Sequence, residues 1–150
     1  MAILITPYTD INATMRGIRT QVIDSLSYCV NDMPSFDNPE QMFKALRNMT
    51  IYQNDPAGVE LLQTVPTLFD NNFHGISGAG DCDCFSILTL AMCIANGWNE
   101  QAIVLAGRSK KSPVHIWTKV KFNGKWYDFD LTQPYFNTTR PYKFQQILPV

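Results

Sequence analysis

The sequence predicts an α+β protein, because helical patterns come first along the chain and strand patterns follow. Apolar residues recur at helical spacing in stretches before Gly97, and after it they alternate or form short continuous runs. The 150 residues, 45% of them apolar, are enough for one hydrophobic core, and no repeat or linker divides them. We therefore expect a single domain over 1–150, with a helical N-terminal layer and a central helix packed on a small antiparallel sheet.

Two helices are expected near the N-terminus. Apolar residues recur at steps of three and four over about 10–30, which is the period of one buried helix face. A second helix is expected over about 39–49, with Asn38 as its N-cap and Pro39 at its first helical position. These two helices would form the N-terminal layer.

Residues 50–80 have an irregular pattern rich in Pro, Gly and Asn, which is typical of loops. Within this segment, only 59–65 has a composition that suits a short helix. Because loops on a rigid scaffold usually set specificity, we expect this segment and the tail over 134–150 to line or cover a binding cleft. The aromatic residues of the tail are expected to anchor it by packing; they are Tyr135, Phe136, Tyr142 and Phe144.

The most apolar window spans 85–95 and lies between a Gly-Asp turn and Asn96-Gly97. At this length it predicts a helix that is buried on most sides and ends at the glycine. Cys82 falls in the first turn of this helix. The start of the most buried helix therefore carries a thiol.

Strands are expected over about 101–107, 114–122 and 125–131. Asn123-Gly124 stands between the last two runs, and this dipeptide is the strongest short-range signal for a hairpin turn. The two strands on either side of it should therefore pair antiparallel.

Composition excludes some classes of partner. Twelve Lys and Arg against thirteen Asp and Glu give a formal net charge of −1, so no overall basic footprint for nucleic acid or an anionic membrane exists. The N-terminal apolar run is short and lacks a basic segment before it, and no stretch reaches the ~18 apolar residues that span a bilayer. We therefore expect a cytoplasmic protein whose four cysteines are free.

Three residues are predicted to meet in one site. Cys82 lies at the start of the buried helix, His115 lies in the second strand, and Asp130 lies on the strand that the hairpin pairs with it. Measured from the Asn123-Gly124 turn, His115 and Asp130 fall within about two residues of register. Their side chains should therefore be neighbours, with Asp128 as the rival acid.

This set of groups suits nucleophilic catalysis by a thiolate. A helix N-terminus and an adjacent imidazolium both lower the pKa of a thiol, so Cys82 is predicted to be activated by the helix and by His115. Asp130 would hold the imidazole in the tautomer that serves first as base and then as acid. Cys84 lies about 200° around the helix from Cys82 and so faces elsewhere, while Cys29 and Cys93 read as small buried hydrophobes.

These blocks resemble the transglutaminase-like superfamily of papain-type cysteine peptidase folds, over about a third of the chain. The matching residues are Gly80-Asp81-Cys82, an apolar helix closed by Gly97, His115-Ile116-Trp117, Gly124-Lys125-Trp126 and Asp130-Leu131-Thr132. The resemblance implies a papain-like fold with Cys82 as nucleophile, His115 as base and Asp130 as orienting acid. It also implies that Trp117 and Trp126 are structural aromatics. Candidate oxyanion donors are the Cys82 backbone N–H and the Gln63 side chain.

A weaker resemblance concerns Glu60–Thr64 followed by Gly-Asp-Cys-Asp, which is similar to the variant of this family encoded in phages and prophages. In that variant Cys84 would be an acid, so this sequence departs from the pattern there. The resemblance implies a bacterial host cytoplasm or a virion as the location, and other phage or virion proteins as partners.

The predicted function is cysteine-dependent acyl transfer on an amide or ester of a protein or peptide, through a thioacyl-enzyme and without a cofactor. One alternative is a catalytically inactive papain-like scaffold that acts as a virion or interaction protein. Another is a zinc-binding domain built from His74, Cys82, Cys84 and His115. Structural zinc sites usually show two paired knuckles, and this chain has a single C-x-C, so we expect no metal.

Overall fold

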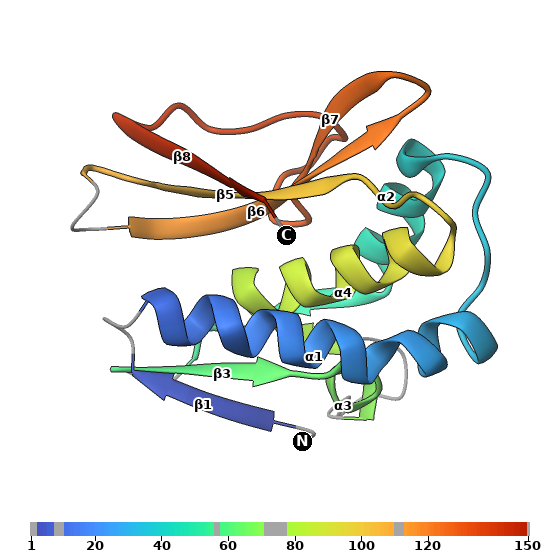
Figure 1. The fold of residues 1–150 in the computed structure, drawn as a ribbon, viewed down its shortest axis with the longest axis horizontal. Coiled ribbons are helices and arrows are strands. Elements are labelled where there is room, and N and C mark those ends of the chain that lie inside the picture. The colour runs from blue at the N-terminus through green and yellow to red at the C-terminus, as the bar shows by residue number, and fades with distance from the viewer. Residues whose placement is uncertain (1–2, 8–10, 56–57, 71–77, 110–112, 150) are drawn as a thin grey trace.

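The computed structural model describes residues 3–7, 11–55, 58–70, 78–109 and 113–149. They form a mixed α+β structure, as predicted, in which helices α1 and α4 lie between a four-stranded and a two-stranded sheet (Figure 1). In chain order the elements are β1 (Ile3–Pro7), α1 (Ile11–Asn31), α2 (Pro39–Asn48), β2 (Thr50–Tyr52), β3 (Val59–Gln63), α3 (Val65–Asp70), β4 (Gly78–Gly80), α4 (Cys82–Ala95), β5 (Gln101–Gly107), β6 (Pro113–Phe122), β7 (Lys125–Phe129) and β8 (Phe144–Pro149).

The two predicted N-terminal helices are confirmed. One face of α1 is buried and packs along α4. Helix α2 begins as expected, because the Asn38 side chain accepts a hydrogen bond from the Gln41 N–H at 2.8 Å and Pro39 occupies the first helical position. Local capping chemistry therefore sets where α2 begins.

Helix α4 runs through the centre of the molecule. Every residue from Asp83 to Cys93 is buried, because the helix contacts β6 on one side and β3 on the other. After this helix the chain changes direction at Gly97, whose φ of +82° is a conformation that glycine adopts without strain. The prediction of a helix buried on most sides is confirmed.

The main sheet has the strand order β7-β6-β5-β8, with every neighbouring pair antiparallel. The predicted hairpin is confirmed, since Asn123 and Gly124 have φ values of 51° and 80°, as a type I′ turn requires. The tail was expected to line or cover a cleft, and its residues Arg140 and Tyr142 do line the cleft beside His115, while its last part forms β8 and pairs with β5. The sequence does not reveal this strand because its partner is almost forty residues away and its side chains are only partly buried.

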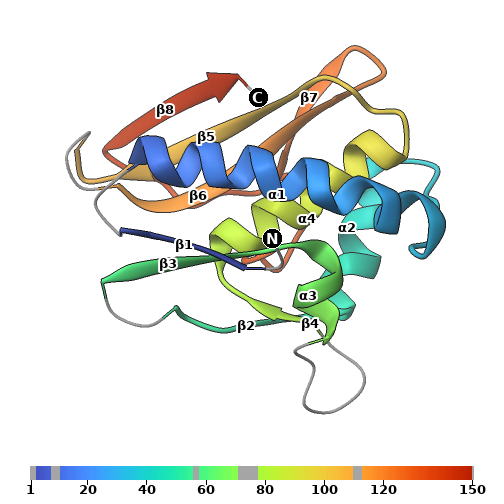
Figure 2. The same ribbon diagram turned by 60° about the horizontal axis from the view of Figure 1, so that its bottom comes forward.

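The prediction that residues 50–80 form an irregular loop is also partly wrong. Val59–Gln63 forms strand β3, paired antiparallel with β1, and the short helix begins only at Val65 (Figure 2). Leu62 lies against α1 at Gly17, where an added Cβ would collide with the leucine side chain. This strand therefore depends on a distant partner and on close packing, neither of which has a local signal.

Within the described residues, no helix is both long and apolar enough to cross a lipid bilayer.

Candidate active site

Cys82 is the first residue of α4. The carboxylate of Asp81 caps this helix by accepting from the N–H groups of Asp83 and Cys84, at 3.2 and 3.4 Å. Gly80 lies just before the cap, and a Cβ there would come within 2.7 Å of Cys84 Cβ. The half-buried Cys82 thiol lies against β6, where it hydrogen-bonds the backbone of Ile116.

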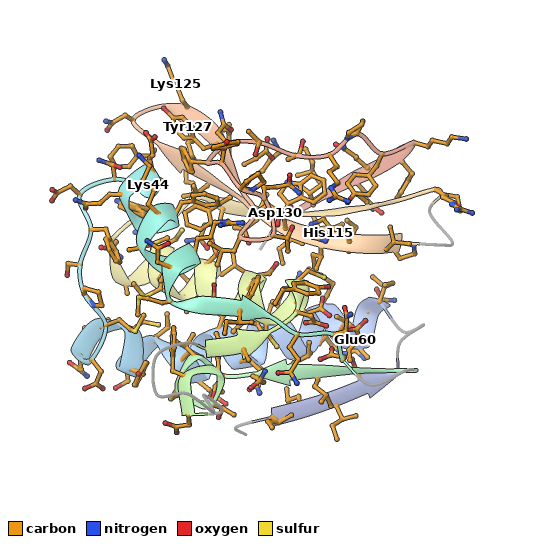
Figure 3. All side chains as sticks on the ribbon, turned by 180° about the vertical axis from the view of Figure 1, so that it is seen from behind. Lys44, Glu60, His115, Lys125, Tyr127 and Asp130 are labelled. Carbon is orange, nitrogen blue, oxygen red and sulfur yellow. The ribbon has the colours of Figure 1, made fainter. Side chains whose placement is uncertain are left out.

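His115 and Asp130 lie side by side, as Figure 3 shows. His115 Nε2 is 2.7 Å from Asp130 Oδ2. Thr118 pairs with Phe129, so Asp130 falls beside Trp117, two residues along β6 from His115. The register predicted from the hairpin therefore brings these two side chains together.

The orientation of Asp130 is fixed by Thr132. Oδ1 of Asp130 accepts from the Thr132 backbone N–H at 3.0 Å and from its hydroxyl at 2.7 Å, while Oδ2 faces the histidine. Asp130 is only 4% exposed, so these bonds replace those it would make with water. The carboxylate is therefore held in one position against His115 Nε2.

The rival acid Asp128 has other partners. Its Oδ1 accepts from Trp117 Nε1 at 2.9 Å and lies 3.1 Å from Lys119 Nζ. Trp117 is buried, with 2% exposure, and its ring lies beside that of His115. Trp126 does not lie in the core, because it is 47% exposed where β7 forms the edge of the sheet opposite Lys121.

Cys82 and His115 line the same small cavity, of about 50 Å³, together with Ile116, Glu60 and Asp83. Because Nε2 of His115 is engaged by Asp130, Nδ1 is the ring nitrogen left to exchange a proton with a thiol. On another side, His115 borders an open cleft of about 480 Å³. The imidazole thus stands between the cavity of the thiol and a larger space.

The electrostatic surroundings of Cys82 differ from the prediction. Burial, followed by the charges of Asp83 and Asp81, raises the pKa of the Cys82 thiol well above its ordinary value, although the hydrogen bond from Ile116 acts in the opposite direction. The predicted lowering considered the helix N-terminus and the imidazole but not the neighbouring acids. In this conformation Cys82 is therefore a neutral thiol near pH 7.

Those acids belong to a cluster that the sequence did not reveal. One carboxylate oxygen each from Asp55, Glu60, Asp81 and Asp83 lies within 4.8 Å of the others. Burial, with hydrogen bonding and charge from the neighbouring acids, raises the pKa of Asp81 from 3.8 to about 8, and burial likewise raises that of Asp83. These carboxyl groups therefore share protons. Asp55 and Glu60 come from a segment more than twenty residues before Asp81 and Asp83, so the packing of β3 and the chain before it against α4 creates the cluster.

Gln63 and Cys84 contact each other. Gln63 Nε2 donates to the Ala79 carbonyl at 3.0 Å and lies 3.6 Å from Cys84 Sγ. Cys84 Sγ in turn donates to the Leu61 carbonyl at 3.1 Å. Cys84 thus has its own buried partners on the side of β3, whereas Cys82 faces β6. An oxyanion role for Gln63 stays a prediction.

The zinc alternative gains no support from the part of the chain that the structure describes. Cys84 is directed to Leu61 and Gln63 rather than to the cavity of Cys82 and His115. His74, the remaining predicted ligand, lies outside the described residues. Within them, the group of side chains close enough to hold a metal ion is the acidic cluster, whose oxygens are the ligand type of hard cations.

Comparisons with known proteins gave one structural similarity. No family model and no curated protein sequence matches the chain. Among solved structures, the chain is similar to a "Putative Cysteine Protease from Cytophaga hutchinsonii", with 15% sequence identity and a TM-score of 0.46. The match covers 85% of this chain and 45% of that one, so this chain spans less than half of its length. At this identity and score, the likeness assigns no activity to the chain.

Proposed function

We propose that this protein is a cysteine-dependent hydrolase or acyltransferase with a transglutaminase-like, papain-type fold, acting on an amide or ester bond of a protein or peptide. Cys82 would be its nucleophile, His115 its general base and acid, and Asp130 its orienting acid. The observation that carries the proposal is the His115–Asp130 contact of 2.7 Å beside a cavity that Cys82 also lines, at the start of a buried helix.

The reaction begins with a proton transfer. Because the surroundings raise the pKa of the Cys82 thiol, the sulfur carries its proton at rest. As the sulfur attacks the carbonyl carbon, Nδ1 of His115 takes the thiol proton, and Asp130 stabilises the imidazolium through Nε2. Bond formation and proton transfer are therefore coupled.

The second half of the reaction reverses these transfers. The imidazolium gives its proton to the leaving amine or alcohol as the carbon–nitrogen or carbon–oxygen bond breaks, which leaves a thioacyl-enzyme on Cys82. Water or an amine, deprotonated by His115, then attacks this thioester and releases the thiol. Hydrolysis follows from water and amide exchange from an amine.

The oxyanion of the tetrahedral intermediate needs hydrogen-bond donors. Asp81 caps the N–H groups of Asp83 and Cys84, whereas the N–H of Cys82 is the first of the donors that an α-helix leaves unpaired. We assign this N–H as one donor, with the Gln63 amide as a second candidate. The first belongs to α4 itself and the second to β3, which packs against α4.

The test is to trap the intermediate. A mixed peptide library with a dansylated primary amine is incubated with the protein, and intact mass spectrometry after acid quenching is expected to find an acyl adduct on Cys82. Product analysis should find hydrolysed or amine-modified peptides. Cys82→Ala should abolish both signals, whereas Cys29→Ala, which removes a buried thiol in α1, should retain them.

If the folded, unmodified protein turns over no peptide and forms no adduct on Cys82, the proposal is contradicted. That result favours the alternative of an inactive papain-like scaffold that binds a partner protein. Turnover that survives Cys82→Ala would contradict the assignment of the nucleophile.

A further inference from the structure

The cleft of about 480 Å³ beside His115 is larger than the cavity of about 50 Å³ that His115 shares with Cys82. Its volume is in the range of small-ligand sites. His115, Thr132, Tyr142, Arg47 and Arg140 are among the residues that line it. The imidazole that would protonate the leaving group therefore lines this cleft.

The charge of this cleft is of one sign. Arg47 and Arg140 are the permanently charged residues of its described lining, and no Asp or Glu belongs to that lining. Neither arginine forms an ion pair with a described carboxylate. The chain as a whole carries a formal net charge of −1, so this local excess of positive charge is not a general property of its surface.

Arg47 is tied to the loop that follows β7. Its Nε donates to the Gln133 carbonyl at 2.6 Å, and the Gln133 N–H donates to the Asp130 carbonyl at 3.0 Å. One of the five guanidinium N–H groups is thus used for positioning, while the terminal nitrogens keep the fork geometry that matches a carboxylate. The guanidinium is therefore oriented relative to the backbone of Asp130.

Arg140 lines the same cleft, two residues before Tyr142 in the chain. The Tyr142 ring stacks on His115, with ring centroids 6.1 Å apart and planes 28° apart. The charge of Arg140 lowers the pKa of Tyr142, against the larger raising effects of burial and of Asp130. Arg140 is therefore within electrostatic reach of the ring that covers the proposed catalytic histidine.

We propose that this cleft is a substrate subsite that selects a carboxylate, such as an Asp or Glu side chain next to the scissile amide, and binds it with Arg47 and Arg140. The inference rests on the proposed function, since it names the substrate class of the same site. The described lining of the other cavity of His115 includes Glu60 and Asp83 but no Lys or Arg, so the arginine partners for a carboxylate lie on the cleft side. This asymmetry would orient a peptide.

Two alkylating reagents that differ in charge test this inference directly. Iodoacetate is an anion and iodoacetamide is its neutral counterpart, and both react with the same Cys82 thiolate. The ratio of their rates therefore cancels the fraction of thiolate present. We expect Arg47→Gln and Arg140→Gln each to lower the iodoacetate-to-iodoacetamide ratio about fivefold, and added salt to weaken the effect.

Lys44→Gln is the matched control, because Lys44 lies one turn before Arg47 on α2, outside the cleft, and pairs with Glu40. Figure 3 shows its side chain pointing away from His115 and Asp130. This variant removes the same charge and should leave the ratio unchanged. Circular dichroism of each variant checks folding, and both arginines are exposed, so the fold should persist.

A second measurement uses paired peptides that differ only by Glu or Gln next to the cleaved bond. The Glu peptide should have the lower KM, and the double arginine variant should remove this difference while kcat changes little. If the double variant keeps both the iodoacetate-to-iodoacetamide ratio and the preference for Glu, the inference is overturned but the proposed triad is not affected. Failure of both reagents to label Cys82, with no peptide turned over, would instead overturn the proposed function.

Discussion

At the scale of single residues, the site joins a well-oriented acid–base pair to a thiol whose surroundings oppose ionisation. Asp130 is held through both oxygens and faces His115, which the hairpin register allowed us to predict. The sequence led to the wrong direction for the pKa of Cys82, because burial, the largest cause of the rise, depends on packing, and because the charges of Asp83 and Asp81 beside it were not considered. Sequence order thus predicts the partners within the hairpin, but not the groups that packing brings to the thiol.

Replacing Asp130 by Asn tests the orienting role. The amide keeps the shape of the side chain but loses the negative charge that stabilises the imidazolium, and it presents a donor as well as an acceptor to Nε2. We expect kcat/KM to fall by about 10² to 10⁴-fold with KM little changed. Asp128→Asn is the control for nearby charge, since Asp128 contacts Trp117 and Lys119, and a fall of equal size in that variant would contradict the assignment.

Replacing Asp83 by Asn tests the cause of the raised pKa of Cys82. Removal of an ionisable carboxyl next to the sulfur favours the thiolate, so alkylation by iodoacetamide should become about threefold to tenfold faster at alkaline pH. The gain should grow with pH, because Asp83 itself ionises late. Site-resolved mass spectrometry across pH measures this rate. An unchanged profile would show that burial alone holds the thiol protonated, and Asp37→Asn, which is exposed on the loop before α2, should have no effect.

At the scale of elements, capped helices and the short hairpin are predictable, whereas strands with distant partners are not. Asn38 and Pro39 define the start of α2, and Asn123-Gly124 defines the turn between β6 and β7. Strands β1, β3 and β8 pair with segments far along the chain, and their sequences lack a clear alternation of apolar and polar residues. Such pairing is decided by tertiary packing rather than by local propensity.

The cap of α4 should make stability depend on pH. Folding raises the pKa of Asp81 from 3.8 to about 8, so the folded protein retains a proton that the unfolded chain loses. The contribution of Asp81 to the free energy of unfolding should therefore be fully present below about pH 4 and should be lost as the pH rises toward 8. Asp81→Asn keeps the cap and should flatten that decline.

Urea unfolding at a series of pH values measures this dependence. Asp81→Ala is the comparison variant, because it removes both the carboxyl and the cap and should be about 1 kcal/mol less stable than Asp81→Asn at every pH. A decline from pH 4 to 8 that is equally steep in Asp81→Asn and in the unmodified protein would contradict the assignment of this proton to Asp81.

At the scale of the whole molecule, the proposed triad draws on two layers. Cys82 belongs to the central helix, while His115 and Asp130 belong to the main sheet and the loop after it. Helix α2 covers the end of that sheet through Phe43, whose ring meets those of Phe129 and Phe136 at 5.4 and 5.7 Å. The same helix carries Arg47, so this aromatic contact also supports the cleft.

Replacing Phe43 by Ala tests this support. The side chain is 2% exposed, and its loss leaves a cavity between α2 and the sheet, so the free energy of unfolding should fall by about 3–5 kcal/mol. Urea unfolding at neutral pH measures it. Phe43→Leu fills most of the space and should cost clearly less, whereas equal losses in the two variants would mean that the ring contacts, rather than the volume, hold α2 in place.

The placement of the thiol on one layer and of the imidazole on another has a consequence for how the protein would lose activity. The alignment of the sulfur with the ring nitrogen depends on the packing of α4 against β6. A shift of about 1 Å between the helix and the sheet would therefore abolish catalysis while both stay folded. On heating or on addition of urea, the midpoint for the loss of activity should therefore come before the midpoint for the loss of secondary structure.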